Sequence, residues 1–233
     1  MKPPGERPPL DPPVLAYISD SYPHNLDYSI TRGVLKPRWK LRSRLKRLQA
    51  LYANPLGDLL DLSSSKGFFV LDAATHPECK RALGIDVHAP DIEASRAVAL
   101  HLGLIKARFE LTTLRELSAT IEARGGAFDT VLLVNTYPYL FFGSDRSEAT
   151  AEDHDEIFRL LATVCAGRLV FSNRVDFAAL PRHIQKRARE SRLEENYDEA
   201  IISAAAQKHF VLEKLKPLKK IPLWLLTPID HSA

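Results

Sequence analysis

From residue 58 onward, short apolar runs alternate with longer segments whose apolar residues recur at helical spacing. The apolar runs predict buried strands at residues 58–62, 81–87, 107–111, 128–135 and 167–172. The intervening segments predict helices that end near residue 74 or span residues 90–102, 113–123 and 151–165. Strands that alternate with helices form a parallel sheet covered on both faces, so the pattern predicts a doubly wound α/β fold.

The end of the chain departs from this alternation. A helical region over about residues 181–208 is followed by two strands, at 210–215 and 221–226. The link between them is too short for a crossover helix, so the two strands must pair antiparallel. The complete prediction is a seven-stranded mixed sheet, mostly parallel with a C-terminal antiparallel hairpin, with helices on both faces.

The beginning of the chain has a different composition. Residues 1–23 contain seven of the 16 prolines, which predicts an extended tail or wrapping arm. Leu41, Leu45, Leu48 and Tyr52 then recur at steps of four, three and four, which predicts an amphipathic helix within residues 37–52. We therefore divide the chain into a proline-rich arm, residues 1–33, and one α/β domain, residues 34–233.

Composition excludes several classes of protein. With 233 residues, 45% hydrophobic and 26% charged, the chain is typical of a globular domain that needs neither disulfides nor metal ions for stability. Cys79 and Cys165 match neither a disulfide framework nor a zinc spacing, and no histidine pattern predicts a metal site. No apolar run is long enough to span a membrane, and residues 1–9 do not resemble a secretory signal. We expect a soluble, cytoplasmic protein without metal or membrane partner.

Charge is concentrated near the beginning of the chain. The formal net charge is only +3, yet no acid lies between Asp27 and Asp58. That stretch contains the bases Arg32, Lys36, Arg38, Lys40, Arg42, Arg44, Lys46 and Arg47. Such a block attracts phosphates or another anionic partner, although many charge runs are simply solvated helix faces.

Polar residues follow the predicted strands at their carboxyl ends, where doubly wound sheets bind ligands. The first strand leads into Asp61-Leu-Ser-Ser-Ser-Lys-Gly67, and the second ends at Asp86. Thr112 follows the third strand, and Asn135-Thr-Tyr-Pro-Tyr139 follows the fourth. Asp86 is placed to accept hydrogen bonds from both hydroxyls of a ribose, and the helix after Gly67 offers free N–H groups.

This order of parts resembles the class I S-adenosylmethionine-dependent methyltransferases, which have a Rossmann-like fold. The resemblance covers about residues 36–227 and implies that S-adenosyl-L-methionine is the cofactor. It implies cofactor-binding roles for Asp61, Ser63, Ser65 and Gly67 in the first loop, for Asp86 at the ribose and for Thr112 at the adenine edge. It places Asn135 beside the methyl donor and near the substrate.

The first loop departs from the family pattern, which is Asp/Glu-x-Gly-x-Gly-x-Gly. This chain keeps Asp61 and Gly67 but has Ser63 and Ser65 at the first two glycine positions. Either the serine hydroxyls contact the methionine end of the cofactor, or cofactor binding is lost and the chain is a catalytically silent binding or scaffold protein. A nicotinamide-dependent Rossmann enzyme is a weaker alternative, because its G-x-G-x-x-G loop is missing.

Methyl transfer requires alignment and a dry pocket more than it requires protein groups that react. Asn135 and Tyr137 are candidates to orient the acceptor, and Tyr139 or His154 to accept a proton. Both tyrosines are more often packing residues. The segment Asp153-His154-Asp155-Glu156 is better explained as a solvated helix N-terminus than as a metal site.

The acceptor itself is not predicted by the sequence. The basic helix between Lys36 and Arg47, with Trp39 inside it, makes structured RNA one possibility. Trp39 is equally suited to cover the cofactor as a lid, with a small metabolite bound beneath it and beneath the loop 140–150.

Overall fold

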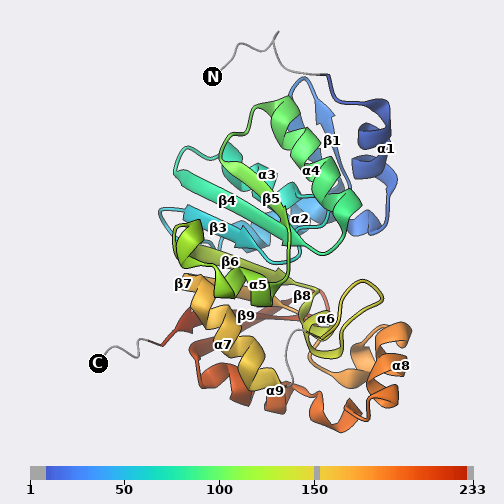
Figure 1. Ribbon diagram of the computed structural model, residues 1–233, viewed down its shortest axis with the longest axis vertical. Coiled ribbons are helices and arrows are strands. Elements are labelled where there is room, and N and C mark those ends of the chain that lie inside the picture. The colour runs from blue at the N-terminus through green and yellow to red at the C-terminus, as the bar shows by residue number, and fades with distance from the viewer. Residues whose placement is uncertain (1–8, 150–152, 230–233) are drawn as a thin grey trace. The chain divides into compact units, whose positions relative to one another are not determined.

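The computed structural model describes residues 9–149 and 153–229. The chain divides into two compact units, residues 1–112 and residues 113–233 (Figure 1). The first eight residues of the predicted arm, and the predicted start of the helix at 151–152, lie outside the described residues.

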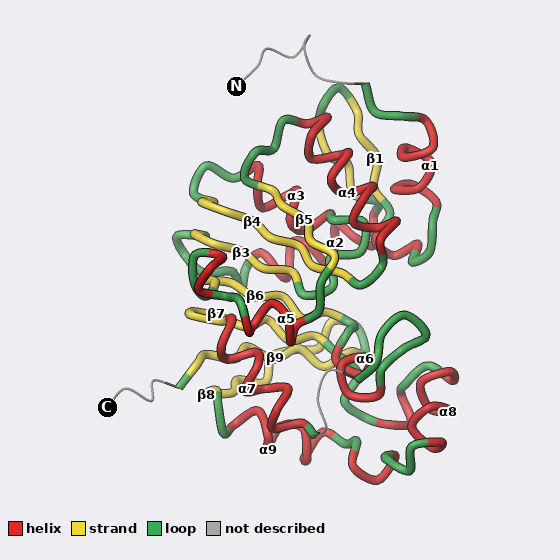
Figure 2. The backbone as a smooth tube through the Cα atoms, viewed as in Figure 1, coloured by secondary structure: helices red, strands yellow, loops and turns green. Residues whose placement is uncertain are grey.

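The first unit contains three strands of the main sheet, a small hairpin and four α-helices, which Figure 2 distinguishes by colour. In chain order they are α1 Pro12–Asp20, the 3-10 turn η2 His24–Leu26, β1 Tyr28–Thr31, β2 Val34–Pro37, α2 Trp39–Gln49, β3 Gly57–Asp61, α3 Phe68–Thr75, β4 Cys79–Asp86, α4 Ala89–Leu102 and β5 Ala107–Leu111. β3 and β5 both pair parallel with β4, so their carboxyl ends lie at one edge.

The second unit contains four strands and the remaining helices. They are α5 Leu114–Ala119, η3 Glu122–Arg124, β6 Phe128–Val134, α6 Tyr137–Phe142, α7 His154–Val164, β7 Cys165–Ser172, η4 Phe177–Ala179, α8 Arg182–Glu190, η5 Glu194–Asn196, α9 Glu199–Gln207, β8 Phe210–Leu218 and β9 Ile221–Pro228. β6 and β7 are parallel, whereas β9 is antiparallel to both β7 and β8.

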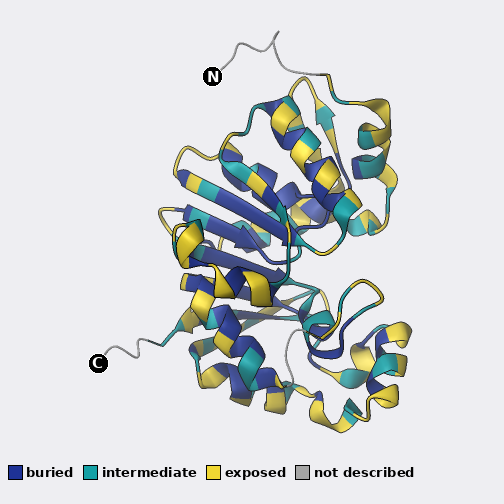
Figure 3. Cartoon of the chain, viewed as in Figure 1, coloured by how far each residue is buried: buried dark blue, intermediate teal, exposed yellow. Residues whose placement is uncertain are grey.

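The predicted seven-stranded mixed sheet is confirmed, with the strand order β5-β4-β3-β6-β7-β9-β8. In β4 the four consecutive residues 82–85 are buried, as Figure 3 shows in dark blue. Successive side chains of a strand point to opposite faces, so burial of consecutive positions means that both faces are covered. α3 packs against β3 and β4, and α4 packs against β4 and β5.

The sequence pattern did not predict helix α1, the hairpin β1–β2 or helix α6. The extended segment predicted for residues 1–23 is wrong at residues 12–20, where Pro12 and Pro13 occupy the first turn of α1. Proline is tolerated there because the first N–H groups of a helix have no intrahelical partner. The hairpin β1–β2 and the short helix α6 were also missed. The boundary after residue 33 stays a prediction.

The predicted amphipathic helix is confirmed as α2, with Leu41 and Leu48 fully buried. Within residues 9–149 and 153–229, none of the helices combines the length and the apolar character that a bilayer crossing requires.

Candidate functional site

The loop after β3 turns sharply through two left-handed residues. Ser65 has φ 44° and Gly67 has φ 77°, where Gly67 is the N-cap of α3. A Cβ at Gly67 would lie 2.6 Å from Ser95 Oγ and 2.8 Å from the ring of Phe109, so only glycine fits. The loop therefore makes a glycine-type turn even though Ser65 stands where the family has glycine.

Asp86 lies at the carboxyl end of β4 and is bonded to this loop. Its Oδ2 accepts a hydrogen bond from the Ser65 N–H at 2.9 Å, and its Oδ1 accepts one from the His88 N–H at 3.0 Å. Burial raises the pKa of Asp86, and these N–H donors oppose that effect. Because each carboxylate oxygen has two acceptor sites, both oxygens can still accept a ligand hydroxyl.

Asp61 ends β3 with its side chain buried, and it accepts a hydrogen bond from the Ser63 N–H at 3.3 Å. Burial, opposed by the hydrogen bond from the Ser63 N–H and assisted by the nearby charge of Asp86, raises the pKa of Asp61 to about 7. A cationic ligand group beside Asp61 would offset the cost of its buried charge.

The serine hydroxyls of the loop differ in their surroundings. The hydroxyls of Ser64 and Ser65 are buried, and neither has a hydrogen-bond partner. Ser64 packs against β4, because a Cβ added at Gly84 would lie 2.7 Å from its Cβ. Ser63 is half-buried. An unpaired buried hydroxyl costs about 1–3 kcal/mol, so a polar ligand group at Ser65 would be stabilising.

Thr112 follows β5, as the sequence predicts. It is half-buried, and its N–H donates to the backbone oxygen of Asp86 at 3.2 Å. The first unit thus brings Asp61, Ser65, Gly67, Asp86 and Thr112 to the carboxyl ends of β3, β4 and β5. Their roles toward a cofactor stay predictions.

Sequence reasoning missed the contacts of Lys66. Its side chain is fully buried and donates to the backbone oxygen of Ser21 at 2.8 Å and to the carboxylate of Asp27. The Tyr28 hydroxyl donates to the Lys66 backbone oxygen at 2.8 Å. Arg38 also contacts Asp27, at 3.2 Å. The chain segment before β1 is therefore fastened to the loop after β3.

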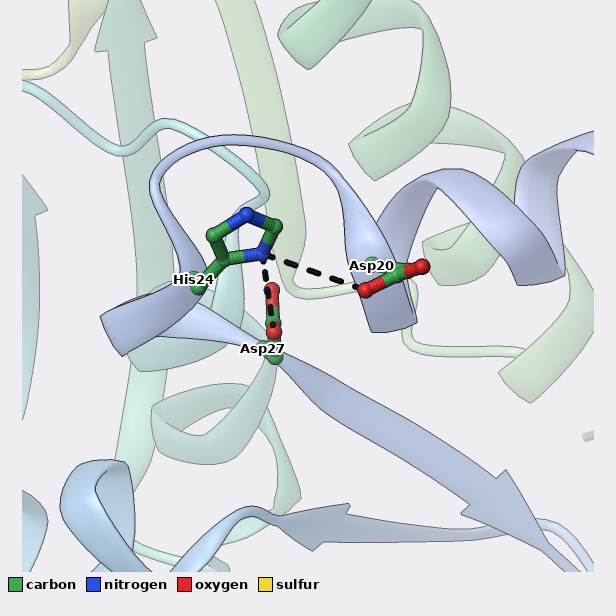
Figure 4. A group of neighbouring side chains, drawn as sticks. All are labelled: Asp20, His24 and Asp27. Atoms are coloured by element: carbon green, nitrogen blue, oxygen red, sulfur yellow. Dashed lines mark ion pairs between the residues drawn. The ribbon is translucent and has the colours of Figure 1, made fainter.

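Asp20, His24 and Asp27 form the one group of three metal-ligating side chains among the residues that the structure describes (Figure 4). His24 Nδ1 lies 3.9 Å from Asp20 and 3.6 Å from Asp27. Lys66 and Arg38 already neutralise Asp27, so a divalent cation would meet two positive charges there. We assign this group to ion pairing.

In the second unit, Asn135 follows β6 with φ 59° and donates its N–H to Ser172 O at 2.9 Å. Its side-chain oxygen is buried without a hydrogen-bond partner. Asn173 shapes the following turn, because its Oδ1 accepts from the N–H groups of Thr136 at 2.7 Å and Tyr137 at 2.9 Å. Nothing in the sequence pattern identified Asn173.

Tyr137 is fully buried, with its hydroxyl 2.7 Å from His154 Nδ1. His154 Nε2 lies 2.8 Å from the Asn196 backbone oxygen, which only an N–H can satisfy, so Nδ1 accepts from Tyr137. Burial lowers the pKa of His154, which favours the neutral imidazole. The solvated helix start predicted around His154 is wrong at this residue, which is a core histidine together with Tyr137.

Tyr139 is half-buried, and its hydroxyl lies 3.4 Å from Nε2 of His183 in α8. Of the predicted acceptor residues, Tyr137 is buried in the core, whereas Asn135 and Tyr139 are half-buried.

No protein-family model matches this chain, and no curated protein matches its sequence. Solved structures do match. WbdD aligns with a TM-score of 0.59 and 19% identity over 84% of this chain, which spans only 39% of the WbdD chain. The PH0226 protein from Pyrococcus horikoshii OT3 aligns with a TM-score of 0.56 and 18% identity, covering 82% of this chain and 92% of that one.

N-methyltransferase NodS from Bradyrhizobium japonicum WM9, in complex with S-adenosyl-L-homocysteine, aligns with a TM-score of 0.55 and 15% identity. The match covers 82% of this chain and 92% of NodS. Together with the strand order and the terminal hairpin, these similarities show that the chain has the class I S-adenosylmethionine-dependent methyltransferase fold.

Proposed function

We propose that this chain is an S-adenosylmethionine-dependent methyltransferase that binds its cofactor at the carboxyl ends of β3, β4 and β5. The observation that carries the proposal is the pairing of Asp86 with the Ser65 N–H, which fixes a carboxylate beside a tight loop. A ribose diol needs such an acceptor, and the buried unpaired hydroxyl of Ser65 is suited to a second polar contact.

The residues present fit the cofactor in charge and in polarity. Asp86 would accept the ribose hydroxyls, and Asp61 would stabilise a cationic group. Ser65 would donate its hydroxyl, and Thr112 would lie at the adenine. The cofactor would supply an electrophilic methyl group, so the protein's own contribution is to bind, orient and exclude water.

For the acceptor, we propose a positioning role for Asn135, because its amide oxygen is buried and lacks a hydrogen-bond partner. We keep Tyr139 as the second candidate, since it is half-buried and its hydroxyl lies 3.4 Å from His183 Nε2. An acceptor that is an amine would need orientation alone, whereas a hydroxyl acceptor would also need a base.

The second candidate function is a catalytically silent binding protein with this fold. The observations that favour it are the serines at two glycine positions and the use of Asp86 by the loop's own backbone. In that case Asp86 would serve only to close the loop, and the chain would bind no S-adenosylmethionine.

Incubation with methyl-labelled S-adenosylmethionine and separate pools of RNA, protein and small metabolites tests the proposal. We expect label to enter one pool in the presence of wild-type protein and not in the presence of Asp86→Ala. Absence of label from every pool, with cofactor binding also absent, would favour the silent protein.

A further inference from the structure

We infer that the segment β1–β2–α2 is a binding surface for single-stranded RNA, with Trp39 as a platform on which a base stacks. The inference rests on the proposed function in one respect: if the chain is a methyltransferase, the bound RNA is its methyl acceptor.

Trp39 is 69% exposed at the start of α2. Large aromatic side chains usually bury most of their surface, so a tryptophan this exposed is available to a partner. Lys40 Nζ lies over the Trp39 ring, 5.6 Å from its centre, which places a cation on the aromatic face. This combination of ring and cation suits a nucleotide, whose base stacks and whose phosphate is anionic.

The spacing along α2 places the tryptophan in the middle of a basic face. Leu41 and Leu48 lie on one side of the helix and are fully buried. Trp39 lies on the opposite side together with Lys46, seven residues further along the helix. Arg42 and Lys40 flank this line on its two sides, and both are exposed.

The chain segment that forms β1, β2 and α2 contains no acidic residue. No acid occurs between Asp27 and Asp58, and Asp27 is buried in its pair with Lys66. The hairpin adds Arg32 and Lys36, both exposed. The basic helix α8 is different, because Lys186 lies 3.7 Å from Glu190 and Arg187 lies 2.7 Å from Asp145.

Other anionic partners fit this surface less well. A helix that lies on a membrane inserts its apolar face, but the apolar face of α2 is buried in the protein. Duplex RNA keeps its bases stacked, so it offers no free base to Trp39. Single-stranded RNA matches both the charge and the aromatic ring.

The surface is connected to the candidate cofactor loop within the same unit. Arg38, at the N-cap of α2, contacts Asp27, and Asp27 contacts Lys66 of the loop. RNA held along α2 would therefore be bound by a segment that is fastened to that loop.

Fluorescence anisotropy with a short, unstructured, labelled RNA and no cofactor tests the inference. We expect Trp39→Ala to weaken binding about fivefold or more, and Trp39→Phe to recover most of that loss. Removing three charges in Lys40→Ala/Arg42→Ala/Lys46→Ala should lower the slope of log affinity against log salt by about two. The matched control Arg182→Ala/Lys186→Ala/Arg189→Ala in α8 should bind RNA like the wild type.

The same variants are titrated with S-adenosyl-L-homocysteine and with anionic phospholipid vesicles. Unchanged binding of S-adenosyl-L-homocysteine together with weakened RNA binding supports the inference, whether or not the proposed function holds. Equal RNA binding by the α2 and α8 variants would overturn it. A Trp39→Ala variant that loses only affinity for S-adenosyl-L-homocysteine would also overturn it, because Trp39 would then be a lid. So would a Trp39→Ala variant that loses only vesicle binding.

Discussion

Ser65 combines a left-handed backbone, which forms the turn, with a side-chain hydroxyl that is suited to bind a ligand. Its φ of 44° is a conformation that glycine adopts without strain, yet its hydroxyl is buried and unpaired. A left-handed backbone costs a non-glycine residue roughly 1–2 kcal/mol. If Ser65 contributes to function, a favourable interaction of its side chain must offset that cost. We propose that the offset is a contact with the cofactor.

Ser65→Gly tests this at the residue scale. Relief of the left-handed strain and the greater backbone entropy of glycine oppose each other, so the free energy of unfolding should change by less than about 1 kcal/mol. Affinity for S-adenosyl-L-homocysteine should fall about threefold to tenfold, the usual value of one hydrogen bond. Calorimetric titration measures the affinity, and urea unfolding measures the stability.

Ser64→Ala is the matched control, because the Ser64 side chain packs against Gly84 of β4. It should leave the affinity unchanged. Tighter binding by Ser65→Gly would show instead that Ser65 is a substituted glycine that hinders the ligand.

Several site residues could be predicted because they follow the carboxyl ends of predicted strands. Contacts between residues far apart in the sequence could not be predicted. Asp61 and Asp86 follow apolar runs, so their place at one sheet edge could be read from the sequence. The contact of Lys66 with Asp27 joins residues 39 positions apart, and no periodicity reports such a pair. Tyr137 was uncertain for a similar reason, since its partner His154 comes from another helix.

At the scale of elements, the buried pair Lys66–Asp27 fastens the segment before β1 to the loop before α3. Breaking a buried pair by removing one partner typically costs about 3–5 kcal/mol, because the other charge stays buried. Asp27→Asn should therefore destabilise the fold strongly in urea unfolding. It should also weaken S-adenosyl-L-homocysteine binding, since the loop loses its support.

The double variant Asp27→Asn/Lys66→Met separates the two contributions. It removes both charges, so its loss of stability should be smaller than the sum of the two single losses. Asp20→Asn, at an exposed residue near the same histidine, should be close to the wild type. Additive losses in Asp27→Asn and Lys66→Met would contradict the anchoring role.

Elements with a clear hydrophobic period were predictable, and those that begin with proline were not. The strands and the antiparallel hairpin followed from apolar runs and link length, and they agree with β3 to β9. Helices α1 and α6 both carry proline in the first turn, where it favours a helix rather than ending one. The same residue type is a breaker elsewhere, so composition alone misassigned residues 12–20.

At the scale of the whole molecule, the comparisons with solved structures show the fold. The assignment of an activity depends on particular residues. Identities of 15–19% with the solved structures described above establish the arrangement of strands and no more. The run of basic residues from Arg32 to Arg47 lies in the first unit, which also carries the loop, Asp61 and Asp86. The proposed methyltransferase activity therefore depends on whether that unit binds the cofactor.

Titration calorimetry with S-adenosyl-L-homocysteine on wild type, Asp86→Ala, Asp86→Asn and Asp58→Ala tests this most directly. Asp58 is the matched control, because it lies near the opposite end of β3 in a pair with Arg81 at 2.7 Å. Hydrogen bonds to a charged acceptor contribute about 1.5–3 kcal/mol each, so Asp86→Ala should bind at least tenfold more weakly.

We expect submillimolar binding by the wild type and by Asp58→Ala, with the affinity of Asp86→Asn between those of the wild type and Asp86→Ala. Circular dichroism on each variant separates a lost ligand contact from a lost fold, because Asp86 also holds the Ser65 N–H. Asp86→Ala that is folded and binds as tightly as the wild type, or a wild type that does not bind, would contradict the account.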